Sequence, residues 1–299
     1  MIYERTIRTP VECSGVGLHS GAHANLRILP APAGTGIVFR RTDLDNFEVE
    51  AVSRNVAKVS YATSLMKQGV LISTTEHLLS ACVGIGLDNA FVELDNLELP
   101  MLDGSAQPFI DMIRDAGLRQ QRRKRVYIKI LRPYEMREGD KTIGIYPADN
   151  YTVSYSINFP HPLIGHESFR VELSNGSYVE QIAAARTFGF LEQQQAMLNM
   201  GLIRGASREN CLVLTRDGID NGPLRFPDEF VRHKVLDLIG DLALFGKRVF
   251  GYVKADRAGH AMHTAIVSRV LRDPTYWEEV TLDEHAASQF PEEHLAVAD

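Results

Sequence analysis

Three polar residues of the kind that bind cations stand at regular intervals in an otherwise apolar segment. His233, Asp237 and Asp241 recur every four residues in FVRHKVLDLIGDLALFG, residues 230–246. A step of four residues turns an α-helix only about 40° past one full turn, so the three side chains share one helix face. A helix that is apolar nearly all round is normally buried, and a buried carboxylate must be paired, hydrogen-bonded or bound to a metal. The spacing therefore predicts a buried helix whose polar face needs a cation.

Two explanations fit this stripe. Asp237 can form a structural ion pair with His233 one turn away, or with an arginine from elsewhere in the chain. Alternatively, His233 and Asp237 can be two ligands of one Zn²⁺ or Fe²⁺ ion, since their spacing suits a shared metal. A catalytic metal generally needs a third protein ligand and an open position. The segment alone leaves both explanations open.

A third ligand is predicted in the segment TTEHLLS, where His77 directly follows Glu76. A lone buried histidine is more often structural than a ligand, but a carboxylate beside it changes that balance. A water activated by a metal needs a proton acceptor, and HExxH enzymes place that acceptor next to a ligand on one helix. HExxH itself is absent, because residue 80 is serine. We therefore expect His77, His233 and Asp237 as metal ligands, with Glu76 as general base.

A second histidine candidate is His260 in AGHAMH, a turn-like segment after a predicted strand. A flexible loop there can bring the imidazole to the open side of the metal. A protonated His260 can stabilise a developing oxyanion and protonate a leaving amine. Asp241 can keep that ring charged, because a nearby carboxylate raises the pKa of a histidine. At this point a structural or surface role for His260 is equally compatible with the sequence.

The elements that must position these residues follow a similar order in each half. Alternating or β-rich stretches predict strands, and apolar residues at helical spacing predict helices. In the first half we expect strands at 23–29, 37–41 and 90–94 and helices from 74 to 86 and 109 to 117. In the second half we expect strands at 126–131, 142–147, 151–159 and 211–214, a largely helical stretch at 177–202 broken near 187–190, and the helix that carries His233. This order predicts an α+β protein of two similar domains, 1–125 and 126–299.

Composition narrows the class of protein. The formal net charge of the 299 residues is −6, and the basic run RQQRRKR at 119–125 has no interleaved aromatics, so we expect no nucleic-acid binding and read the run as a solvated connection. The start MIYERTIRTP is unlike a signal peptide, and no apolar stretch is long enough to span a bilayer. Three widely separated cysteines, Cys13, Cys82 and Cys211, suit a reducing compartment. We expect a cytoplasmic protein that is not integral to a membrane.

Several motifs, in order along nearly the whole chain, are similar to those of one known family. The motifs are GVGLHSG at 15–21, TTEHLLSA at 74–81, MLDGSAQPF at 101–109, ARTFGF at 185–190, and HKVLDLIGD at 233–241 followed by GHAMH. With these motifs the sequence resembles the UDP-3-O-acyl-N-acetylglucosamine deacetylases of lipid A biosynthesis.

The resemblance implies a fold and a reaction. Each of the two domains would be a mainly antiparallel sheet with helices, and the helical layers would pack together between the two sheets. A zinc ion, with Fe²⁺ as the alternative metal, would lie where the domains meet. The enzyme would hydrolyse the 2-acetamido group of UDP-3-O-(3-hydroxyacyl)-N-acetylglucosamine and release acetate and a free amine. Its partner would be this UDP-sugar with one acyl chain, and the protein would be a monomer.

The resemblance also implies residue roles by motif matching. The zinc ligands are His77, His233 and Asp237, the general base is Glu76, and His260 is the charged acid oriented by Asp241. Thr187 assists the oxyanion, and an insert at about 191–212 forms an acyl passage. The substrate-binding residues are expected to be His19, Tyr61, Phe159, Phe188, Leu198, Leu202, Lys234 and Arg257.

Three positions depart from the family pattern. His263 stands where an asparagine is expected, Asn158 replaces an aspartate before Phe159, and Arg257 replaces a lysine. An arginine keeps the cation but changes its geometry. These departures bear on affinity and acyl-length preference more than on the class of reaction. Two alternatives stay open: a related amidase acting on another nucleotide sugar, and a binding protein that has lost catalysis.

Overall fold

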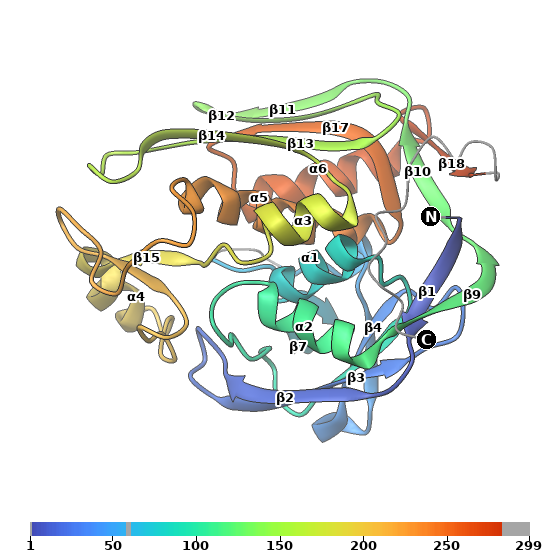
Figure 1. The fold of residues 1–299 in the computed structure, drawn as a ribbon, viewed down its shortest axis with the longest axis horizontal. Helices are drawn as coiled ribbons and strands as arrows, with labels where there is room; N and C mark the ends of the chain where they lie inside the picture. Colours follow the sequence, from blue (N-terminus) through green and yellow to red (C-terminus); the bar gives the residue numbers. More distant parts are fainter. Residues whose placement is uncertain (1, 58–60, 283–299) are drawn as a thin grey trace.

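Helices lie between two sheets in the computed structural model, which describes residues 2–57 and 61–282 (Figure 1). The strands β2, β3 and β4 lie at the bottom of the view, β11 to β14 and β17 lie at the top, and α1, α2, α3, α5 and α6 occupy the space between them. This arrangement confirms the expected α+β class with helical layers between mainly antiparallel sheets. The predicted second domain extends to residue 299, and its last part, 283–299, lies outside the described residues.

The first sheet has five strands in the order β2-β3-β8-β4-β5, and only the β4–β8 pair is parallel. Strand β3 alternates over residues 23–28, with Ala24, Leu26 and Ile28 buried and the residues between them exposed, because one face of the sheet packs on the helices. The elements are β2 (Val11–Val16), β3 (His23–Pro30), β4 (Ile37–Arg41), β5 (Phe47–Glu50), β8 (Ala90–Leu94), α1 (Glu76–Ile85) and α2 (Gln107–Ala116).

The second sheet has seven strands, with β11-β12-β17-β10-β18 in order and β13 and β14 attached through β17. Its β10–β17 and β13–β17 pairs are parallel, and the others are antiparallel. The elements are β10 (Val126–Ile130), β11 (Tyr134–Glu138), β12 (Lys141–Tyr146), β13 (Tyr151–Phe159), β14 (Gly165–Glu172), β17 (Arg248–Asp256), β18 (Trp277–Thr281), α3 (Asn175–Gln181), α5 (Glu229–Leu242) and α6 (His260–Arg272).

Smaller elements complete the described chain. A short parallel pair, β15 with β16, and helix α4 project from the body at the left of Figure 1. The stretch at 177–202 is less helical than predicted, because α3 ends at residue 181, a short strand occupies the expected break, and α-helix returns only at 194–199. These elements are β1 (Tyr3–Ile7), β6 (Leu65–Lys67), β7 (Val70–Ile72), β9 (Leu118–Lys124), β15 (Phe188–Phe190), β16 (Leu212–Leu214), α4 (Gln194–Asn199), and the 3-10 turns η1 (Thr42–Leu44), η2 (Ser53–Asn55), η3 (Leu191–Gln193) and η4 (Ala243–Phe245).

The contact between α1 and α5 decides where the polar stripe points. A Cβ atom at Gly240 would lie 2.0 Å from the carbonyl oxygen of Glu76, so only glycine allows the two backbones to approach this closely. Ser80 Oγ donates to the Leu236 carbonyl at 2.8 Å and accepts from Tyr178 Oη at 2.7 Å. These contacts bring the start of α1 against the last turn of α5 and the middle of α1 against the middle of α5.

Two sequence expectations about local structure are wrong in part. The run 119–125 is largely solvated, as expected, but it is more than a connection: residues 119–124 belong to β9, which pairs with β1, and Arg125 is buried in a two-pronged ion pair with Asp88. His260 lies not on a loop but at the first position of α6, after an extended Gly259. Glycine before the helix supplies no side chain to signal the start, which is why the sequence looks turn-like.

The division into domains 1–125 and 126–299 stays a prediction, although residue 125 does fall between β9 and β10, which pair in different sheets. None of the helices in the described part of the chain is long and apolar enough to cross a membrane.

Candidate active site

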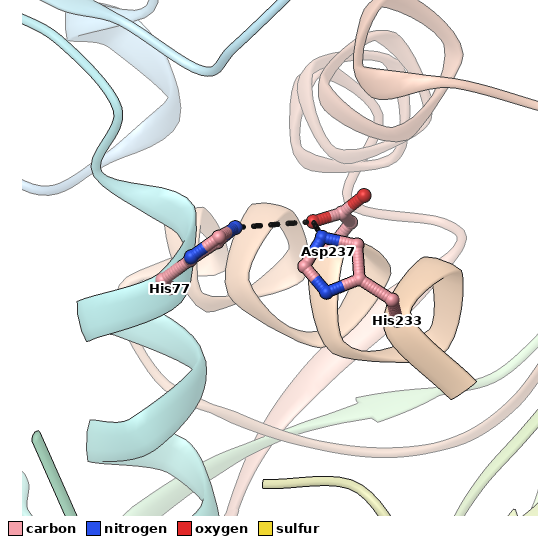
Figure 2. Close-up of side chains that lie close together, drawn as sticks. All are labelled: His77, His233 and Asp237. Carbon is pink, nitrogen blue, oxygen red and sulfur yellow. Dashed lines mark ion pairs between the residues drawn. The ribbon is translucent and has the colours of Figure 1, made fainter. Parts of the chain in front are cut away.

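The three predicted metal ligands meet at the contact between α1 and α5. His77 extends from the first turn of α1 toward His233 and Asp237 on α5, and the carboxylate of Asp237 faces both rings (Figure 2). Asp237 Oδ1 lies 3.6 Å from His77 Nε2 and 3.2 Å from His233 Nε2. One donor atom from each residue lies within 4.8 Å of the other two, and all three residues are buried. The structure thus brings together the set that the spacing predicts.

The chemistry of these donors fits a divalent metal. His233 Nδ1 donates to the Ala185 carbonyl at 3.0 Å, which leaves the lone pair on Nε2 and orients it toward Asp237. Burial lowers the pKa of His233 against the opposing effect of Asp237, and the lowered pKa favours the neutral form that a metal ligand must have. Burial would raise the pKa of Asp237, but His233 and Lys234 hold it well below its usual range. Two histidines and one carboxylate are a common ligand set for a catalytic Zn²⁺.

Glu76 lies directly before His77 and is buried. Its Oε2 accepts a hydrogen bond from the backbone N–H of Thr63 at 3.1 Å, and its Oε1 lies 3.9 Å from His260 Nε2. Burial raises the pKa of Glu76, against the opposing effect of His260 and His77. A carboxylate with a raised pKa is a better proton acceptor near neutral pH.

Asp241 accepts hydrogen bonds on both carboxylate oxygens. Its Oδ2 lies 2.7 Å from His260 Nδ1 and 2.8 Å from His263 Nδ1, and its Oδ1 accepts a short bond from Thr63 Oγ1. Burial lowers the pKa of His260, but the carboxylates of Asp241, Asp237 and Glu76 outweigh it and raise the pKa to about 9. His260 is therefore charged at neutral pH, as the sequence predicts for a ring held by Asp241.

A pocket of about 540 Å³ opens over these residues. Glu76, His77, Asp237 and His260 line part of its wall. Phe159 and Phe188 meet edge to face, with ring centroids 5.7 Å apart, and form an apolar wall. Six of the predicted site residues also line the pocket: His19, Tyr61, Phe159, Thr187, Phe188 and Lys234.

Lys234 lines the pocket and also contacts a predicted metal ligand. Its Nζ donates to Asp237 Oδ2 at 2.7 Å and lies 5.5 Å from the centre of the Phe188 ring. The ammonium thus neutralises a predicted metal ligand while it faces the pocket.

Three predicted substrate contacts do not line this pocket. The wall contains Met197 and Ile203 in place of Leu198 and Leu202, because neighbouring residues of a helix or a tight turn point in different directions, about 100° apart on α4. Arg257 instead bonds the Asp140 carbonyl at 2.7 Å and the Asp256 carboxylate at 3.0 Å. Two acidic neighbours on the surface hold the guanidinium away from the pocket.

Sequence reasoning missed two residues that organise the site. Thr63 contacts both Glu76 and Asp241, and no motif marks it. Glu98 is buried and accepts from His19 N at 2.9 Å, Ser20 N at 2.6 Å and Thr74 Oγ1 at 2.8 Å, so it ties the GVGLHSG loop to the turn before α1. The sequence signal for Glu98 is a glutamate flanked by leucines in NLELP, because a charged residue in an apolar setting is unusual and calls for a partner.

The fold and this arrangement define a class of protein. A side-chain group that can hold a metal, beside a buried carboxylate and a charged imidazole in a pocket, is typical of metal-dependent hydrolases.

Comparison with known proteins identifies the family. The model of the family LpxC, UDP-3-O-acyl N-acetylglycosamine deacetylase, matches residues 4–272, and the chain belongs to that family. It is 51% identical over 288 residues to the UDP-3-O-acyl-N-acetylglucosamine deacetylase of Solibacter usitatus (strain Ellin6076), covering 96% of this chain and 97% of the relative. The proteins of the same name from Anaeromyxobacter sp. (strain Fw109-5) and Myxococcus xanthus (strain DK1622) are 47% and 43% identical, covering 91% and 93% of this chain and 89% of each relative. These matches confirm the resemblance.

Proposed function

We propose that this protein hydrolyses the 2-acetamido group of UDP-3-O-(3-hydroxyacyl)-N-acetylglucosamine, an early step of lipid A biosynthesis. The observation that carries the proposal is the convergence of His77, His233 and Asp237 beside Glu76 and His260 in one pocket. Membership of the LpxC family and the names of its relatives support the substrate.

In this proposal His77, His233 and Asp237 hold Zn²⁺, with Fe²⁺ as the alternative. A bound metal of this kind polarises an amide carbonyl and acidifies a water. The residues of the chain then set the geometry: the Ala185 carbonyl fixes the His233 ring, and Lys234 limits the negative charge of Asp237.

Glu76 and His260 divide the proton transfers. Glu76 takes a proton from water as the water oxygen bonds to the acetyl carbon, and its raised pKa suits that step. His260 enters the reaction charged and gives a proton to the leaving nitrogen as the carbon–nitrogen bond breaks, which yields acetate and the amine. Until then, His260 and the Thr187 hydroxyl stabilise the oxyanion, whose charge is larger in the tetrahedral state than in the substrate.

The pocket also suits the rest of the substrate. Phe188 and Phe159 offer flat apolar surface to the sugar and its surroundings, and the ring nitrogens of His19 are buried without a hydrogen-bond partner among the described residues, so they can bond a polar group of the ligand. The acyl chain would lie along Leu191, Met197 and Ile203, which line the same pocket. Leu198 and Leu202 do not line this pocket, so we do not assign them to the acyl passage.

We also propose that the protein is a monomer and acts in the cytoplasm. Cys13, Cys82 and Cys211 are free thiols, which suits a reducing compartment.

The decisive test is acetate release from the acylated UDP-sugar by purified protein, before and after chelation and after addition of Zn²⁺ or Fe²⁺. We expect activity that disappears with chelation and returns with metal. Unacylated UDP-N-acetylglucosamine is the matched control substrate, and its equal turnover would point to an amidase of another nucleotide sugar. Metal-loaded protein that binds the substrate without releasing acetate would refute the proposal and favour a binding protein.

A further inference from the structure

A closed ring of polar contacts beneath the pocket links four residues. Thr63 takes part in it through both its backbone N–H and its hydroxyl. The backbone N–H of Thr63 donates to Glu76 Oε2 at 3.1 Å, and Glu76 Oε1 lies 3.9 Å from His260 Nε2. His260 Nδ1 lies 2.7 Å from Asp241 Oδ2. Asp241 Oδ1 closes the ring by accepting from Thr63 Oγ1, which itself lies 3.3 Å from His260 Nδ1.

Every polar atom of Thr63 is engaged. Its carbonyl accepts from the backbone N–H of Thr75 at 3.1 Å and from Thr75 Oγ1 at 3.2 Å, at the turn that precedes Glu76. Thr63 itself has no exposed surface. The hydroxyl of Thr75, the residue before the first turn of α1, makes no hydrogen bond to the helix and donates to Thr63 instead. These bonds hold Thr63 against the start of α1, independently of its contact with Asp241.

The two sides of this ring come from different parts of the fold. Glu76 lies on α1, while Asp241 and His260 lie at the end of α5 and the start of α6. Asp241 Oδ2 already faces His260 and His263. A bond from Thr63 to Oδ1 stops the carboxylate from rotating away from that pair.

We propose that Thr63 is a positioning residue that holds the Asp241 carboxylate, and through it the His260 ring, in register with the general base Glu76. The inference rests on the proposed function, because it assigns Glu76 and His260 to the two proton transfers. Proton transfer requires donor and acceptor within hydrogen-bond reach, so a small rotation of His260 slows the chemical step without removing the group.

Thr63→Val is the informative variant. Valine has nearly the shape of threonine and keeps the backbone bond to Glu76, but it leaves Asp241 Oδ1 without its donor. We expect kcat to fall by about tenfold to a hundredfold, with KM changed by less than about threefold and the bound metal per chain unchanged, because Thr63 touches none of the predicted ligands. Thr63→Ser keeps the hydroxyl and should restore most of the kcat.

Thr6→Val is the matched control. Thr6 is also fully buried, and its hydroxyl accepts from Ala31 N at 3.0 Å, in a contact outside the pocket. It tests the cost of losing one buried threonine hydroxyl elsewhere, and we expect its kcat to match the wild type.

A double-mutant cycle separates positioning from a general effect on the fold. If Thr63 acts through Asp241, Thr63→Val should change kcat by less than about twofold in an Asp241→Ala background. Three results would overturn the inference. They are a fall in kcat in the Asp241→Ala background as large as in the wild-type background, a wild-type kcat in Thr63→Val alone, and a loss of bound metal in Thr63→Val that Thr63→Ser does not restore. An inactive wild-type enzyme would instead refute the proposed function, so the two failures are distinguishable.

Discussion

The charge on His260 is the property of the site that one substitution tests most directly. Asp241→Asn keeps the size of the side chain and a hydrogen-bonding oxygen but removes the negative charge 2.7 Å from His260 Nδ1. Asp241 is the largest of the effects that raise the pKa of His260, while burial, which lowers it, remains. We therefore expect the pKa of His260 to fall from about 9 toward or below its ordinary value of 6.5.

The size of the effect follows from these two values. A full fall from about 9 to 6.5 corresponds to about 3.4 kcal/mol of lost preference for the charged ring. At pH 7.5 the charged fraction would then drop from about 97% to about 9%, a tenfold loss before any loss of orientation. The apparent pKa of the basic limb in the pH profile of kcat/KM should fall by the same interval, so the variant should lose most activity at high pH.

Two measurements check this reasoning. The pKa of His260 can be followed by NMR titration of metal-free protein, and the pH profile by acetate release from the metal-loaded enzyme. Asp241→Glu is the control, since it retains the charge and should retain a raised pKa. A His260 pKa that stays within about half a unit of the wild-type value in Asp241→Asn would refute the electrostatic argument.

The remaining predictions concern the base, the metal, stability and packing. Glu76→Gln should lower kcat by about a hundredfold to ten-thousandfold while metal content, measured by elemental analysis, stays at the wild-type level; unchanged acetate release would exclude Glu76 as the base. His233→Ala should reduce bound metal per chain, whereas His166→Ala, on an exposed position of β14, should not; equal metal in both would remove His233 from the ligand set. Because the folded pKa of His260 lies above the unfolded value, its charge adds stability that is complete below about pH 6.5 and is lost as pH rises through about 9; urea unfolding across this range should show a decline that Asp241→Asn reduces. Gly240→Ala would place a Cβ 2.0 Å from the Glu76 carbonyl and should cost about 1–3 kcal/mol by thermal or urea unfolding, whereas Gly259→Ala meets no atom within 4 Å and should cost less.

Local patterns in the sequence were enough to predict most elements. The predicted strands 37–41, 90–94 and 151–159 coincide with β4, β8 and β13, because β-branched and aromatic residues suit a pleated, partly buried surface. The four-residue spacing of His233, Asp237 and Asp241 predicted the buried stripe of α5, because the backbone geometry of a helix fixes which residues share a face. The terminal glycine of α1 was also readable, and Gly86 adopts a positive φ of 88°.

Patterns of this kind carry no information on the direction of a side chain at an irregular position. Arg257 has a φ of 50° after β17 and turns to Asp140 and Asp256. Leu198 and Leu202 are apolar residues in the predicted acyl passage, yet their neighbours Met197 and Ile203 line the pocket. Such choices depend on which neighbours are nearby in space.

The candidate residues of the site can be read from the sequence: two histidines and an aspartate as predicted metal ligands, a glutamate beside one of them, and an aspartate at the right spacing to hold a further histidine. How these side chains meet depends on the packing of the fold. Close passage of α1 over Gly240 sets His77 against His233 and Asp237, and a hydroxyl 178 residues before Asp241 in the chain completes the ring around His260. Local periodicity is written into a few consecutive residues, whereas a contact across so many residues depends on the packing of the whole helical layer between its two sheets.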